Sequence, residues 1–385
     1  MVDARSRPDA CPGAFRFHQA ADGPLARVRL PGGTLTPGQV QTLAESARDL
    51  GNGEIELTSR ANVQLRAISD PQALTNRLGD AGLLPSRTHE RARNILASPL
   101  TGRIGGLTDL RGMVDELDRR LCADARLAEL PGRTLFTLDD GRGDITPLGG
   151  DFGIHAVGQT EVAVVLAGRD SGARIAVTDS VTVLLDAARV FLELRDQHWR
   201  LSEITDAVER TLASLTLAPT AEPVTGFGEH HAPIGWLEQP DGGVTLGGGL
   251  AFGILDTRMA EFLAAIDKPV IITPWKTLLL CDLDEWSAEQ VVRVLAPMGL
   301  IFDENSPWLN VSACTGQPGC EKAHADVRAD AREAVRSGEV PPEGRTHWSG
   351  CERRCGRPSG EVTDIVATAT GYRAATATGY QVESP

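Results

Sequence analysis

Four cysteines near the C-terminus have the spacing needed to hold a metal cluster. They form two short pairs, Cys314 with Cys320 and Cys351 with Cys355. An iron–sulfur cubane needs four converging thiolates, and two such pairs suffice if the fold brings them together. A tetrahedral zinc site also takes four thiolates, but the tighter spacing typical of zinc knuckles is missing here. We therefore predict an iron–sulfur site, with four unrelated buried thiols as the alternative.

A second candidate site is the polar face of a strand expected over residues 54–68. Apolar and polar side chains alternate along this stretch, which is typical of a β-strand. The polar face carries Arg60, Asn62, Gln64 and Arg66. Guanidinium groups bind carboxylates through paired hydrogen bonds, so this face could bind a ligand rich in carboxylates. A solvated outer face of a sheet is an equally good interpretation of the pattern.

Composition excludes several classes of protein. The chain has 385 residues and a net charge of −14, which argues against a nucleic-acid partner and against an anionic membrane surface. We expect no transmembrane helix and no secretory signal, because no long apolar run and no apolar leader are present. An odd number of cysteines with metal-like spacing favours a reducing cytoplasm. No nicotinamide-binding glycine motif follows a strand, so electrons should come from a separate protein.

The same order of expected elements occurs twice along the chain. Thr58 and Leu65 in the first copy align with Thr273 and Leu280 in the second, about 215 residues later. In each copy we expect a strand, a helix, a long strand and a second helix, with a closing strand near residue 85. A polar helix is expected from Glu321 onward. The predicted domains cover residues 1–85, 86–220, 221–303 and 304–385.

These features resemble the sirohaem-type nitrite and sulfite reductase superfamily. The resemblance is carried by residues 58–65, by the turn at Arg93 and Asn94, by the duplication and by the cysteine quartet. Within that superfamily the chain is most similar to the precorrin-3B synthases of aerobic cobalamin synthesis. The stretches over residues 11–13 and 25–33 support this narrower resemblance.

The resemblance implies an α+β fold that is internally duplicated, with two ferredoxin-like half-domains and two α/β lobes. It implies a 4Fe-4S cluster on the four cysteines, with Cys355 at the position that bridges to the iron of sirohaem in the reductases. The residues implied in tetrapyrrole binding are Arg60, Asn62, Gln64, Arg93, Asn94 and Arg133. Sulfite-reducing relatives carry two lysines where this chain has Arg133 and Leu135, which puts oxyanion reduction in doubt.

The activity implied is that of an iron–sulfur monooxygenase. Precorrin-3A would be hydroxylated with dioxygen and would form a lactone, with a second, non-haem iron and an external reductase that uses NADH or NADPH. One alternative is a sirohaem-dependent nitrite or sulfite reductase, which would bind haem. Another is a non-catalytic tetrapyrrole-binding or iron–sulfur scaffold protein.

Overall fold

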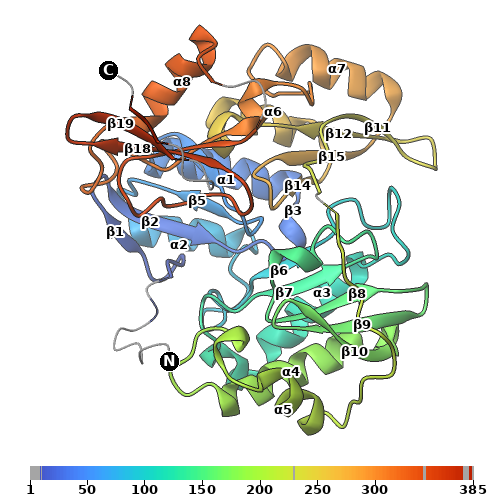
Figure 1. Cartoon of the computed structure of the whole chain (residues 1–385). Coiled ribbons are helices and arrows are strands. Elements are labelled where there is room, and N and C mark those ends of the chain that lie inside the picture. The colour runs from blue at the N-terminus through green and yellow to red at the C-terminus, as the bar shows by residue number, and fades with distance from the viewer. Residues whose placement is uncertain (1–8, 10, 229, 341–343, 376–380, 384–385) are drawn as a thin grey trace.

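Four five-stranded sheets form the framework of the chain. The computed structural model describes all residues except 1–8, 10, 229, 341–343, 376–380 and 384–385. Two of the sheets belong to a central pair of half-domains, and one further sheet lies in each of two lobes (Figure 1). This is the mixed, duplicated architecture expected from the sequence.

Each half-domain has the same sequence of strands and helices. The first contains β1 (His18–Ala20), β2 (Gly23–Val28), β3 (Thr34–Leu35), α1 (Pro37–Leu50), β4 (Glu54–Leu57), β5 (Val63–Leu65) and α2 (Pro71–Asp80). The second contains β11 (Gly235–Glu238), β12 (Val244–Gly248), β13 (Ile254–Asp256), α6 (Thr257–Ala265), β14 (Val270–Ile272), β15 (Leu278–Leu283) and α7 (Glu285–Leu295). Thr36 caps α1 through a capping box with Gln39, which explains why this helix begins where Thr-Pro predicts it.

The two half-domains exchange one strand each. The sheets run in the order β1-β2-β5-β4-β13 and β11-β12-β15-β14-β3, so β13 completes the first sheet and β3 completes the second. The expected closing strand near residue 85 is therefore wrong, because the other copy supplies that edge. Helices α1 and α6 pack together beneath the exchanged strands, and one apolar core contains residues of both halves.

The single strand expected over residues 54–68 is a hairpin of β4 and β5. Thr58 makes the turn: its backbone N–H donates to the Asn62 carbonyl (2.9 Å), and its hydroxyl accepts from the Asn62 N–H (3.1 Å). Ala61 takes a left-handed conformation with φ 52°. The alternation of apolar and polar side chains continues across the turn, because Glu56 lies opposite Gln64 and Leu57 lies opposite Val63. The hairpin at Thr273 repeats this geometry, with Lys276 at φ 60° in the position of Ala61.

The two lobes also share one topology. Lobe 1 contains β6 (Ile95–Ala97), α3 (Arg111–Ala123), β7 (Phe136–Asp139), β8 (Phe152–Ala156), β9 (Glu161–Leu166), β10 (Arg169–Ala176), α4 (Ser180–Leu194) and α5 (Ala207–Ser214). Lobe 2 contains β16 (Val311–Ala313), α8 (Val327–Ser337), β17 (Thr346–Ser349), β18 (Thr363–Thr368), β19 (Gly371–Ala375) and β20 (Gln381–Glu383). In each lobe two parallel pairings are followed by two antiparallel ones.

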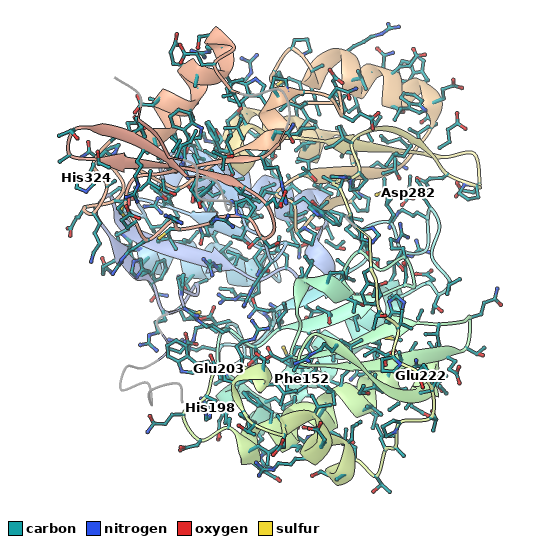
Figure 2. The ribbon with its side chains drawn as sticks, viewed as in Figure 1. Phe152, His198, Glu203, Glu222, Asp282 and His324 are labelled. Carbon is teal, nitrogen blue, oxygen red and sulfur yellow. The ribbon has the colours of Figure 1, made fainter. Side chains whose placement is uncertain are left out.

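Two local features of the lobes bear on the sequence predictions. Helix α8 begins at Val327 rather than at Glu321, because Asp326 caps it by accepting the N–H of Ala329. Lobe 1 has an aromatic core in which Phe152 contacts Phe136 and Phe191 at ring-centroid distances of 5.5 and 5.8 Å (Figure 2). Packed aromatic side chains therefore fill the interior of lobe 1.

Candidate iron–sulfur and tetrapyrrole site

The fold brings the four cysteines to one edge of the lobe 2 sheet. Cys314 follows β16 directly, and Cys351 follows the neighbouring parallel strand β17, so their loops leave the same edge. The Cys314 N–H donates to the Trp348 carbonyl (2.9 Å), and the Gly350 N–H donates to Cys314 Sγ (3.2 Å). Burial raises the pKa of Cys355, and the negative charge of the other three thiolates adds to that effect.

The four thiols are not gathered closely enough in the described structure to share one metal ion. Thiolates sharing one tetrahedral zinc, each about 2.3 Å from it, would lie about 3.8 Å apart. The four cysteines all belong to the described chain, and no three of their sulfur atoms lie within 4.8 Å of one another. Close approach of the loops depends on Gly350, where a Cβ would come within 2.6 Å of Ala323 Cβ. Four cysteine thiols are the donor set that an iron–sulfur cluster takes, so the cluster stays the prediction for this site.

The polar face of the first half-domain lies against these cysteine loops. Arg66 forms a two-pronged ion pair with Asp22 (2.9 and 2.8 Å) and donates to the Gly319 carbonyl at 3.0 Å. Arg328, from lobe 2, donates to Glu56 at 2.6 Å and to the Cys314 carbonyl at 3.2 Å. Both contacts join the β4–β5 hairpin to the segment that carries the thiols.

Three of the predicted binding residues are engaged inside the protein. Asn62 donates to Asn94 Oδ1 at 3.2 Å, and the Asn94 amide donates to the carbonyls of Gly132 (3.0 Å) and Thr134 (3.2 Å). Arg93 forms a buried bidentate ion pair with Asp118, with both bonds at 2.7 Å. These contacts fix the hairpin onto lobe 1. Direct ligand contacts from Asn62, Arg93 and Asn94 stay predictions.

The other three predicted residues have more freedom. Gln64 accepts from Arg27 Nε at 3.0 Å and donates to Glu56 at 3.2 Å. Arg133 is exposed and stacks on Trp199, with its guanidinium carbon 5.0 Å from the ring centroid. Within the described chain the Arg60 side chain makes no hydrogen bond or ion pair, and burial with the charge of Arg200 lowers its pKa to about 10.

Sequence reasoning missed the most buried member of this cationic group. Arg29 is 2% exposed, and its Nη2 has no hydrogen-bond partner among the residues that the structure describes. Burial and the charges of Arg27 and Arg60 lower the pKa of Arg29 to about 9. The signal was present in the alternation of Arg27 and Arg29 along the first strand. Arginines gathered without carboxylate partners form a site suited to an anionic ligand.

The second half-domain has lost the equivalent polar face. Glu56 and Gln64 pair across β4 and β5, and the corresponding pair across β14 and β15 is Ile271 and Leu279. Ile271, Leu279 and Cys281 form a small apolar cluster that packs against Leu100 of lobe 1. Of the two related positions, therefore, one is polar and faces the thiols, and the other is filled by apolar side chains.

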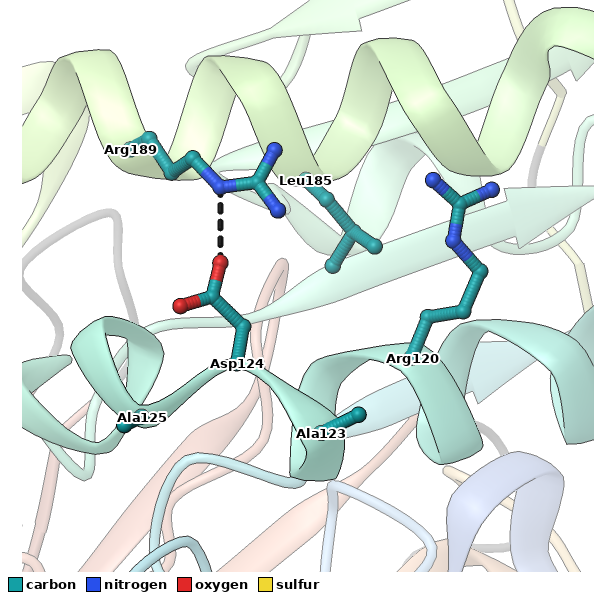
Figure 3. Close-up of a pocket in the computed structure, with 6 residues that line it drawn as sticks. All are labelled: Arg120, Ala123, Asp124, Ala125, Leu185 and Arg189. Atoms are coloured by element: carbon teal, nitrogen blue, oxygen red, sulfur yellow. Dashed lines mark hydrogen bonds and ion pairs between the residues drawn. The ribbon is translucent and has the colours of Figure 1, made fainter.

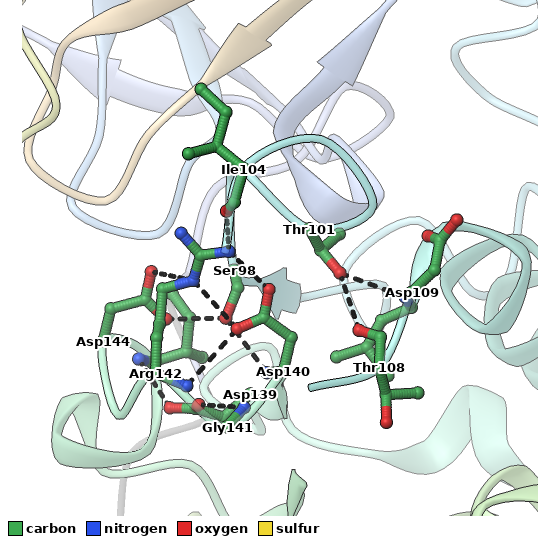
Figure 4. A network of polar contacts seen from close by, with 12 residues as sticks. Ser98, Thr101, Ile104, Thr108, Asp109, Asp139, Asp140, Gly141, Arg142 and Asp144 are labelled. Atoms are coloured by element: carbon green, nitrogen blue, oxygen red, sulfur yellow. Dashed lines mark hydrogen bonds and ion pairs between the residues drawn. The ribbon is translucent and has the colours of Figure 1, made fainter. Parts of the chain in front are cut away.

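Lobe 1 carries an acidic cluster where lobe 2 carries its cysteine loops. The Ser98 N–H donates to the Leu138 carbonyl (3.0 Å), as the Cys314 N–H does to Trp348, and Ser98 Oγ donates to Asp144 at 2.6 Å (Figure 4). Asp139 accepts four backbone N–H groups, and Arg142 pairs with Asp140 (Figure 4). Burial and the charge of Asp139 raise the pKa of Asp144 to about 7. These internal bonds give the cluster a structural role in closing its loop.

A shallow hollow on lobe 1 lies between α3 and α4 and contains no thiol. It is lined by Arg120, Ala123, Asp124, Ala125, Leu185 and Arg189, and Arg189 pairs with Asp124 at 2.7 Å (Figure 3). Arg120 is the one lining charge without a partner in the lining, and this hollow lacks the thiols that distinguish the cysteine site.

Comparisons with known proteins agree with this geometry. The nitrite/sulfite reductase ferredoxin-like half domain matches residues 18–74. The chain is 26% identical over 393 residues to the precorrin-3B synthase of a Sinorhizobium species, covering 96% of this chain and 83% of that protein. It is 24% identical over 409 residues to the assimilatory ferredoxin-dependent nitrite reductase of Haloferax mediterranei, covering 86% and 68% of the two chains. The solved structure of the Mycobacterium tuberculosis NirA protein superposes with a TM-score of 0.73 at 18% identity, over 94% of this chain and 77% of the other.

The comparisons confirm two of the sequence predictions. The chain has the fold of the nitrite and sulfite reductases, and its resemblance to precorrin-3B synthase within that superfamily is confirmed. The likeness to reductases supports an oxidoreductase with an iron–sulfur cofactor. In the described chain no helix is both long and apolar enough to cross a membrane.

Proposed function

We propose that this protein is an iron–sulfur monooxygenase of the precorrin-3B synthase type. It would hydroxylate precorrin-3A with dioxygen and promote formation of the lactone. The observation that carries this proposal is the pair Arg29 and Arg60, which form no ion pair in the described chain, because precorrins carry many acetate and propionate carboxylates. The nearly full-length similarity to a precorrin-3B synthase supports the same choice of substrate.

Each residue has a separate role in the proposal. Cys314, Cys320, Cys351 and Cys355 hold a 4Fe-4S cluster, which supplies single electrons when bound. Arg29 and Arg60 bind substrate carboxylates, since neither guanidinium forms an ion pair in the described chain, although Glu90 and Asp151 lie near enough to act on their pKa values. Asn62, Gln64, Arg93, Asn94 and Arg133 orient these groups or reach the rim of the tetrapyrrole. A non-haem iron would bind dioxygen, and an external reductase using NADH or NADPH would deliver electrons in the cytoplasm.

Residue 135 favours this activity over oxyanion reduction. Leu135 is 2% exposed, and its backbone N–H donates to Asp151 at 2.9 Å, so this position supplies no cation to a small anion. Arg133 lies at the surface, where it stacks on Trp199. A pair of lysines of the kind that accompanies sulfite reduction is thus replaced by one stacked arginine and one buried leucine.

The test is a combined analysis of protein purified without oxygen. We expect four irons and four sulfides for the cluster, additional iron, and no sirohaem on extraction. The protein should then convert precorrin-3A to the hydroxylated lactone when supplied with dioxygen, a reductase and NADH or NADPH. Absence of iron–sulfur absorbance, or absence of conversion by fully loaded protein, would refute the proposal.

A sirohaem-dependent nitrite or sulfite reductase is the second candidate. The similarity to a nitrite reductase over 86% of this chain favours it. Tightly bound sirohaem, together with reduction of nitrite or sulfite by reduced ferredoxin, would establish this alternative. Cluster and tetrapyrrole binding with no turnover of either kind would instead indicate a non-catalytic scaffold protein.

A further inference from the structure

Lys276 extends from the second half-domain to the loop that holds Cys355. Its ammonium nitrogen lies 3.8 Å from the position that a Cβ on Gly356 would occupy. The lysine stem packs over Gly253, where a Cβ would come within 2.7 Å of Lys276 Cβ. Gly253 therefore makes the space through which the side chain reaches the cysteine loop.

The lysine is not required by the turn in which it sits. The related position in the first half-domain is Ala61, which has nearly the same backbone conformation, with φ 52° against 60° for Lys276. Ala61 is 2% exposed and packs against Gly33. Since alanine satisfies this turn, the long charged side chain at position 276 needs a separate reason.

The charge of Lys276 is not neutralised by its surroundings. Nearby carboxylates are already paired: Glu56 with Arg328 at 2.6 Å, and Asp364 with Arg357 at 2.9 Å and Arg354 at 3.2 Å. Among the described residues none forms an ion pair or hydrogen bond with the Lys276 ammonium.

We propose that Lys276 raises the reduction potential of the cluster held by the four cysteines. This inference rests on the proposed function, because it requires the cluster to be present. Four thiolates on an iron–sulfur core leave a net negative charge, and one-electron reduction adds another. A fixed positive charge beside Cys355 stabilises the reduced form more than the oxidised form, especially where burial limits screening by solvent.

The test compares midpoint potentials of loaded variants by redox titration followed with electron paramagnetic resonance. Lys276→Ala should fold, since Ala61 shows that the turn accepts alanine, and Lys276→Gln removes the charge while keeping a polar side chain. We expect both to make the reduced-to-oxidised ratio at a fixed potential about tenfold smaller, which is about 59 mV for one electron. Lys276→Arg should stay near the parent value.

Lys268→Gln is the matched control, because it removes one positive charge from the same half-domain beside Asp284 rather than beside the thiols. Its midpoint potential should equal that of the parent. Unchanged potentials in Lys276→Ala and Lys276→Gln, with full iron and sulfide content, would overturn this inference and leave the proposed function intact. A parent protein that binds no cluster would instead mean that the proposed function itself is wrong.

Discussion

Replacing Arg29 by methionine should stabilise the ligand-free protein while weakening its binding of a carboxylate-rich ligand. The pKa of Arg29 falls from its usual value to about 9, and burial is the largest cause. At about 1.36 kcal/mol per pKa unit, this shift corresponds to an upper limit of about 5 kcal/mol for holding the charge in place. Because the folded-state pKa is lower than the unfolded one, the cost is fully present below about pH 9 and fades as the pH rises towards 12.5.

Several hydrogen bonds offset part of this cost. Arg29 donates to Asn94 Oδ1 at 3.3 Å, to the Arg27 carbonyl at 3.4 Å and to the Pro12 carbonyl, and all three bonds disappear in Arg29→Met. Asn94 keeps its bond from Asn62, so it is not left without a partner. Allowing about 1 to 1.5 kcal/mol for each of the three lost bonds, we expect Arg29→Met to raise the free energy of unfolding by about 1 kcal/mol at pH 7.

The assay is urea denaturation of ligand-free protein, with binding of uroporphyrin as the second measurement. One lost charge-assisted hydrogen bond should weaken binding by about 10- to 100-fold. Arg16→Met is the control: Arg16 is exposed, so its replacement should change neither quantity. Suppose that Arg29→Met is less stable than the parent, while the slope of its unfolding free energy against urea concentration and its affinity for uroporphyrin are unchanged. Arg29 would then be a structural residue and not part of an anion site.

Three further predictions concern other parts of the chain. Cys351→Ser should remove the iron–sulfur absorbance and the labile sulfide, whereas Cys122→Ser, on α3, should leave both unchanged. Asp144→Asn should raise the free energy of unfolding at pH 8 by at most about 4 kcal/mol and leave it unchanged near pH 4. The reason is that a pKa raised from 3.8 to about 7 makes the wild-type protein lose stability as the pH rises between those values. If the pKa of Asp144 had its usual value, denaturation at the two pH values would show no such difference. Thr36→Ala should lower the free energy of unfolding by about 1 kcal/mol through loss of the α1 cap, and an unchanged denaturation midpoint would contradict the capping role.

Local signals in the sequence predicted helix positions well but could not reveal the hairpins. The cap at Thr36 and the stop at Gly51 mark α1 correctly, since the bonds involved join residues within one helical turn. The alternation over residues 54–68 has the same period in a straight strand and in a hairpin whose arms are in register. Only the left-handed conformation of Ala61 reverses the chain, and alanine gives no sequence signal for it.

Long-range features were harder still to predict. The exchange of β3 and β13 depends on pairings such as Leu35 with Val270, across most of the chain, and β3 is only two residues long. The cysteines were found because thiols in paired spacing are rare, whereas Arg29 looked like an ordinary polar position in an alternating strand. Its importance comes from burial without an ion-pair partner in the described chain, which is a property of the folded protein alone.

The exchanged strands help to explain why the two half-domains differ in the faces that they present to the lobes. Each half-domain contributes a strand to the sheet of the other, so the fold requires both. The residues on the faces that they present to the lobes can differ between the two halves. In the first half Glu56 and Gln64 keep a polar face against the cysteine loops, and Arg328 ties it to Cys314. In the second half the corresponding face is apolar and meets Leu100, while Asp282 forms an ion pair with Arg103 at 2.8 Å. Of the two positions related by pseudo-symmetry, the one in the second half-domain therefore forms a structural interface with lobe 1, and the one in the first half-domain keeps its polar side chains.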